Sequence, residues 1–193
     1  MARPGMATLI AAVRAMANAT TSDATIGSET YFTDDHIQQI LDSTQTVWRD
    51  VPLQPAPDVQ DGSLVYLDYH IPDYVPRAFE EFGASSGWAI RTTLGTLIDP
   101  ADYTVNYNSG VITFDTETGG TSYIIDCRTY NLNRSASNVW LRKASFAYQD
   151  VDWGSDNHTL EASQKFNHAL HMAELYAAKA GGTVGRLVRV DEV

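Results

Sequence analysis

Helical periodicity in this chain is confined to its two ends, whereas the middle alternates with a period of two. Near the N-terminus, residues 4–19 place Leu9, Val13 and Met16 on one face at helical spacing. Near the C-terminus, residues 159–180 repeat apolar side chains every three or four positions until two glycines follow. An amphipathic helix needs a partner to bury its apolar face, so the helices at the two ends are expected to pack together.

Two further helices are predicted inside these. One begins at Thr33, whose hydroxyl can cap it, and carries Val47 and Trp48 on its apolar face. The proline at position 52 ends it. The other begins near Asn133, where helical spacing returns. The chain therefore has a pair of predicted helices at each end.

The middle of the chain, from about Gly62, has the pattern of short strands. The strongest hairpin signal joins residues 103–107 to residues 111–114 across a turn that contains asparagine and glycine. Further candidate strands are residues 63–69, 88–91, 96–98 and 121–130. Short strands at this spacing with polar turns favour an antiparallel sandwich or a small barrel.

Together these patterns predict an α+β fold: a four-helix bundle-like core, split by an inserted antiparallel β-sandwich or small barrel, with an extended C-terminal tail. The expected division assigns residues 1–60 to the N-terminal helices of the core and residues 61–131 to the inserted β-rich domain. Residues 132–182 form the C-terminal helices of the core, and residues 183–193 form the tail.

Composition narrows the classes of function. Hydrophobic residues make up 44% of the 193 residues, which is enough for a substantial core, and the longest apolar runs are far shorter than a membrane helix needs. No secretory signal is read at the start. The single cysteine, Cys127, allows no internal disulfide and no cysteine-based zinc cluster, and its apolar surroundings predict a buried strand residue.

The net charge of −11 comes from 24 acidic and 13 basic residues. Such a surface repels a phosphate backbone and does not bind nucleic acid by neutralising phosphates. Ordinary solubility also explains this charge.

No motif for nucleophilic catalysis, phosphate binding or dinucleotide binding occurs in the sequence. His168 and His171 can share a helix face, but the glutamate of a zinc-protease motif is missing, which favours a solvated or interface pair. Asp150, Asp152 and Asp156 suggest a calcium loop, yet the glycine falls one position too early for an EF-hand, so a turn before the last helix is favoured. We therefore expect no enzyme and assign no catalytic, cofactor-binding or metal-binding residue.

Two other features suggest surfaces for partners. The tail alternates apolar and polar residues after the last helix and can add a strand to a partner sheet. The residues that carry this alternation are Gly185, Arg186, Leu187, Val188, Arg189 and Val190. The β-rich middle is also aromatic; its rings are expected to fill the core, with stacking on sugars, for example through an exposed Trp88, as the alternative.

Three stretches, taken in order, resemble the head–tail connector adaptors of long-tailed bacteriophages, also called head completion or neck proteins. They are residues 31–42, residues 98–105 leading to 109–114, and residues 130–164 with the alanine-rich helix that follows. Together they span most of the chain.

The resemblance implies a structural virion protein, made in the host cytoplasm and located in the neck between head and tail. It implies a homo-oligomeric ring, typically a dodecamer, that docks on the portal protein and is continued by a stopper or tail-completion protein. It also assigns the portal contact to the C-terminal tail, and a role in genome packaging and ejection to the ring. DNA would pass through the lumen without specific binding, with no cofactor and no membrane.

Other functions stay open at this point. A carbohydrate-binding or adhesion module would use the aromatic β-rich block. A small hydrolase would need carboxylates brought together from distant positions. A different neck or tail-completion protein is a further structural alternative.

Overall fold

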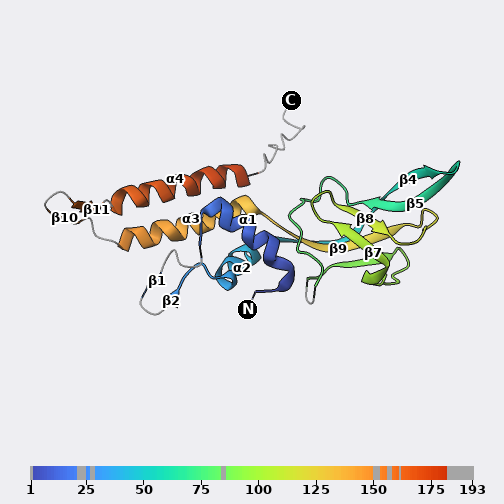
Figure 1. Cartoon of the computed structure of the whole chain (residues 1–193), viewed down its shortest axis with the longest axis horizontal. Coiled ribbons are helices and arrows are strands. Elements are labelled where there is room, and N and C mark those ends of the chain that lie inside the picture. Colours follow the sequence, from blue (N-terminus) through green and yellow to red (C-terminus); the bar gives the residue numbers. More distant parts are fainter. Residues whose placement is uncertain are drawn as a thin grey trace, which may run out of the picture. The chain divides into compact units, whose positions relative to one another are not determined.

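The residues described in the computed structural model form four α-helices and two larger antiparallel sheets, and the chain divides into two compact units (Figure 1). The structure describes residues 2–20, 25–26, 29–83, 86–149, 153–155, 158–160 and 162–181. The first unit, called the β unit below, comprises Met1–Ala11 and Leu41–Tyr130. The second, called the helical unit, comprises Ala12–Ile40 and Asn131–Val193.

The β unit contains both of the larger sheets. The three-stranded sheet has the order β3 (Gln45–Pro52), β9 (Tyr123–Tyr130) and β6 (Ala89–Thr92). The four-stranded sheet has the order β4 (Gln54–Gln60), β5 (Ser63–His70), β8 (Val111–Phe114) and β7 (Tyr103–Asn106). A short 3-10 helix, η2 (Pro100–Asp102), precedes β7. The predicted hairpin is confirmed, since β7 and β8 pair antiparallel with Val105 opposite Ile112.

One aromatic and aliphatic core joins the two sheets. Tyr69 on β5 and Phe114 on β8 both contact Tyr123 on β9, with ring centroids 5.2 and 4.7 Å apart. Ile90 and Ile125, from the other sheet, are completely buried in the same cluster. The interpretation of the aromatic residues as core is confirmed for these rings, and the arrangement is a sandwich.

The predicted second helix extends too far. The helix α2 (Asp34–Asp42) ends at Asp42, and residues 45–52 form strand β3 on the edge of the three-stranded sheet. Val47 and Trp48 pair with Arg128 and Cys127 of β9. The prolines that suggested a helix end stand in edge strands, where the missing N–H removes no ladder hydrogen bond to a neighbour.

The helical unit contains the two long helices, α3 (Leu132–Gln149) and α4 (Ala162–Ala180), which pack along each other. Two short hairpins, β1 (Thr25–Ile26) with β2 (Glu29–Thr30) and β10 (Trp153–Ser155) with β11 (His158–Leu160), complete its described strands. The last helix therefore begins at Ala162 and not at Thr159, because residues 158–160 pair as a strand.

The prediction of a four-helix bundle-like core is wrong. A 3-10 turn, η1 (Pro4–Met6), leads into α1 (Ala7–Ala17), which has 11 residues, and α2 has 9, whereas α3 and α4 have 18 and 19. At 1.5 Å per residue, α2 is about 13 Å long and α4 about 28 Å, so α2 cannot line the length of the long pair. The boundary between the two units also falls inside both α1 and α2.

In the helical unit, the end of α1 and the aromatic residues before α2 contact α3. The Trp140 indole Nε1 donates to the carbonyl of Met16 at 3.3 Å, just before the end of α1. The rings of Tyr31 and Phe32 lie edge-on to Phe146, with centroids 4.8 and 5.8 Å apart. Tyr31 and Phe32, which precede α2, therefore cover part of the surface of α3 that other helices would cover in a four-helix bundle.

In the β unit, the start of the chain is held by a buried ionic network. Glu80 is 1% exposed, and its carboxylate accepts from Arg3 Nε at 2.7 Å and from the Tyr130 hydroxyl at 2.6 Å. Arg3 also donates from both terminal nitrogens to Asp42, at 2.7 and 3.1 Å. Ion pairing with Asp42 and Glu80 raises the pKa of Arg3, and burial raises the pKa of Tyr130. The backbone is tied as well, since the Glu81 N–H donates to the carbonyl of Gly5.

Cys127 is completely buried on β9, which confirms the predicted strand position. Burial raises the pKa of its thiol to about 12. A free thiol ionises near pH 8.5, so the stability that the buried neutral thiol contributes is complete below that pH. It is lost as the pH rises toward the folded-state value.

We therefore expect the native chain to resist thiol reagents at pH 8. A disulfide reagent such as DTNB should react with about one thiol per chain in urea and far more slowly in buffer, because only the exposed thiolate is nucleophilic. Rapid reaction of the native chain would show that the core around Cys127 opens easily.

Candidate interaction surfaces

The end of the β4–β5 hairpin is an exposed apolar surface of the β unit. Strand β5 pairs with β8 only through Asp68, Tyr69 and His70, so residues 58–65 continue as a two-stranded ribbon without a third strand (Figure 1). We call residues 58–65 the arm. Val59 and Leu64 lie opposite each other on one face of the arm and are 66% and 60% exposed.

The turn at the end of the arm explains its sharp reversal. Asp61 and Gly62 have positive φ angles of 49° and 81°, and the strands close on either side of them with Gln60 opposite Ser63. Such a two-residue turn twists in the same sense as the strands it joins. A shift of register at Pro57 adds twist to the edge strand and works against open-ended pairing along it.

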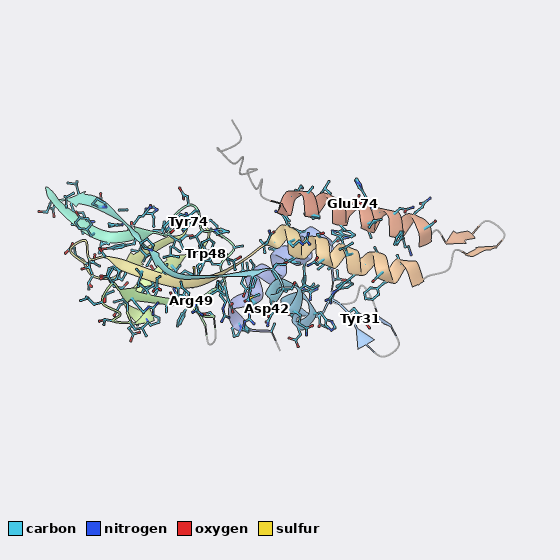
Figure 2. The ribbon with its side chains drawn as sticks, turned by 180° about the vertical axis from the view of Figure 1, so that it is seen from behind. Tyr31, Asp42, Trp48, Arg49, Tyr74 and Glu174 are labelled. Carbon is cyan, nitrogen blue, oxygen red and sulfur yellow. The ribbon has the colours of Figure 1, made fainter. Side chains whose placement is uncertain are left out.

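A second exposed surface of the β unit is aromatic. Tyr74 is 62% exposed, and its ring lies 6.0 Å from the ring of Trp48 (Figure 2). The Trp48 indole Nε1 donates to the Thr129 hydroxyl at 2.8 Å, which fixes that ring. Trp88, by contrast, is only 6% exposed, so the expectation that it could stack on a sugar from the surface is wrong.

The exposed charged side chains of the helix pair are mostly basic. Arg134 and Arg142 on α3 and Lys165 and Lys179 on α4 are exposed. The acidic residue on these two helices is Glu174, which Figure 2 labels. The two helices are therefore positively charged, although the whole chain has a net charge of −11.

His168 and His171 are both exposed on α4, in agreement with a solvated or interface pair. The His168 ring lies edge-on to Trp140, with centroids 5.7 Å apart. Among the described residues no three histidine, cysteine, aspartate or glutamate side chains gather as a metal site would require. No described helix is long and apolar enough to cross a membrane.

Several predicted site residues lie outside the described residues. These are the tail positions Gly185, Arg186, Leu187, Val188, Arg189 and Val190, and the aspartates Asp150, Asp152 and Asp156. Their predicted roles stay predictions.

The arm is the surface that sequence reasoning missed. Its signal is the Asp61–Gly62 dipeptide, which is typical of a two-residue hairpin turn. The prolines at 52 and 55 obscured it, because they suggested the end of a helix. The chain matches no protein-family model, and no curated protein matches it.

Proposed function

We propose that this chain is a structural virion protein, one subunit of an adaptor ring that joins the portal vertex of a phage capsid to the tail. The observation that carries the proposal is the arm, a ribbon that projects from its own sheet and exposes Val59 and Leu64. Exposed apolar side chains rimmed by polar ones are typical of protein–protein contacts.

The rest of the chain supports a structural role over a catalytic one. Most of the aromatic side chains that could have bound a ligand are buried in the sandwich core, as are Tyr69, Tyr103 and Phe114. A ring subunit also needs two different complementary faces so that a head-to-tail contact can close. The acidic arm and the basic helix pair are two such faces.

The charge of the chain suits a conduit. At net −11, a ring of such subunits repels the DNA backbone over most of its surface, so that the genome slides through the lumen without being held. In the proposal the C-terminal tail contacts the portal, and a stopper or tail-completion protein continues the ring below.

The experiment that tests the proposal mixes the purified chain with the portal protein of the same genome and examines the mixture by negative-stain electron microscopy. We expect portal particles with an added closed ring. If the chain stays monomeric and the portal particles are unchanged over a wide range of concentrations, the proposed function is wrong.

A second candidate function rests on Trp48 and Tyr74, whose paired rings at the surface can stack on a sugar. A carbohydrate-binding module predicts retention on a glycan array that Tyr74→Ala removes, and no ring on the portal. The adaptor proposal predicts the reverse on both counts.

A further inference from the structure

The charge of this chain is divided between the long helices and the sandwich. Helices α3 and α4 together carry five basic residues and one acidic residue, a net charge of +4. Residues 45–130, which hold both sheets, carry four basic and twelve acidic residues, a net charge of −8. Two copies of the chain therefore attract most strongly when the sandwich of one meets the helix pair of the other.

The arm is the acidic, apolar end of the sandwich. Val59 and Leu64 form the apolar face and Asp61 stands at the turn, whereas Asp58, next to Val59 on the strand, points to the opposite face of the ribbon. Both aspartates are exposed, and the arm has no basic residue. A partner for this surface must supply an apolar contact with positive charge beside it.

The outer face of α3 has that combination. Arg134, Leu141 and Ser145 follow one another at helical spacing on an exposed stripe, and Arg142 stands next to it. Leu141 is 46% exposed. The face that α3 turns to α4 is a different one, where the Ser137 hydroxyl donates to the carbonyl of Ala173 at 2.8 Å.

The dimensions of the two surfaces agree. Arg142 follows Leu141 directly, and Arg134 lies seven residues before Leu141, about 10 Å along the helix. Asp61 lies two residues beyond Val59, at most about 7 Å along an extended chain. The apolar pair of the arm, about 5 Å across, fits over one leucine.

We propose that the arm of one copy docks on the outer face of α3 of the next copy, so that Val59 and Leu64 cover Leu141 while Asp61, at the turn, lies beside Arg142, and Asp58 adds negative charge from the other face of the ribbon. The inference rests on the proposed ring and names the contact that closes it. Each copy offers an arm to one neighbour and a helix face to the other, which is the head-to-tail pattern a ring requires.

A charge exchange tests this contact. D58K/D61K and R134E/R142E should each abolish ring closure on the portal, because docking then brings an arm and a helix face of like charge together. The chain that carries all four substitutions should form rings again, at roughly the wild-type extent. Each change lies on an exposed side chain, and circular dichroism of each variant checks that it folds.

Control variants separate this contact from net charge. K165E/K179E changes the net charge as much as R134E/R142E does, but at exposed positions of α4, and it should leave ring closure intact. D115K, on an exposed aspartate of the β unit away from the arm, should do the same.

The outcomes distinguish the two proposals. If the wild-type chain forms rings and the arm and α3 variants form them equally well, the docking is wrong and the adaptor function stands. Loss of rings in the separate variants without recovery in the combined one also overturns the docking. If the wild-type chain retains labelled duplex DNA and R134E/R142E loses it while rings are unaffected, the basic face serves DNA. If the wild-type chain never forms rings, both proposals fail.

Discussion

Tyr69→Ala should lower the free energy of unfolding of the β unit by about 3 to 5 kcal/mol. The Tyr69 side chain is completely buried between the sheets, with its ring against Phe114 and Tyr123 at centroid distances of 5.2 Å each. Its removal leaves a cavity that the stiff flanking strands cannot fill. Urea denaturation followed by tryptophan fluorescence measures the effect.

Two matched variants show where this energy comes from. The Tyr69 hydroxyl lies 2.7 Å from the Thr118 hydroxyl and donates to the carbonyl of Thr121 at 2.9 Å, so Tyr69→Phe should cost only about 1 kcal/mol. Tyr74→Ala, at a ring that is 62% exposed, should change stability by about 0.5 kcal/mol or less. Equal losses for Tyr69→Ala and Tyr74→Ala would contradict the division between core and surface aromatics.

Glu80→Ala should lower the free energy of unfolding by about 3 kcal/mol. The carboxylate is 1% exposed and holds Arg3 and the Tyr130 hydroxyl together, so its loss leaves a buried hydroxyl and part of a guanidinium without their acceptor. This expected loss of stability is at the low end of the range for breaking a buried ion pair, because Asp42 still binds Arg3.

The neighbouring residue serves as the control. Glu81 is partly exposed and accepts from the Thr8 hydroxyl at 2.6 Å, so Glu81→Ala should cost about 1 kcal/mol or less. Thermal and urea unfolding of both variants give the comparison. If Glu80→Ala is as stable as Glu81→Ala, the network does not anchor the start of the chain.

The parts of the fold that the sequence predicted well are those with a local cause. Strands β7 and β8 are joined by a short turn containing glycine, so their pairing follows from residues within about ten positions of one another. Cys127 was expected in a buried strand because its neighbours are apolar, and β9 places it there.

The errors arose where distant pairing overrides local pattern. Val47 and Trp48 fit a helical stripe, but β3 forms because β9, nearly eighty residues later, offers it an edge. Because residues 45–52 form this strand, α2 is shorter than predicted and cannot complete a four-helix bundle. The arm was missed for a related reason. The proline-rich sequence of β4 does not indicate a strand, and β4 forms one because it pairs with β5.

The candidate interaction surfaces were predictable only in part. The basic charge of α3 and α4 is in the sequence, but which side faces out depends on the packing of the two helices. Likewise, the sequence does not distinguish Trp88 from Tyr74 as a surface residue. In the folded sandwich, Trp88 is buried and Tyr74 is exposed. Exposure is a property of the assembled fold, which one sequence does not reveal.

The most direct test of the adaptor function is a cryo-EM reconstruction of the intact particle whose genome encodes this chain. We predict a closed ring of copies directly below the portal, with DNA on its axis and the β4–β5 arm of each copy on α3 of its neighbour. Density for the chain only at the capsid surface or the distal end of the tail, or none in the particle, would contradict it.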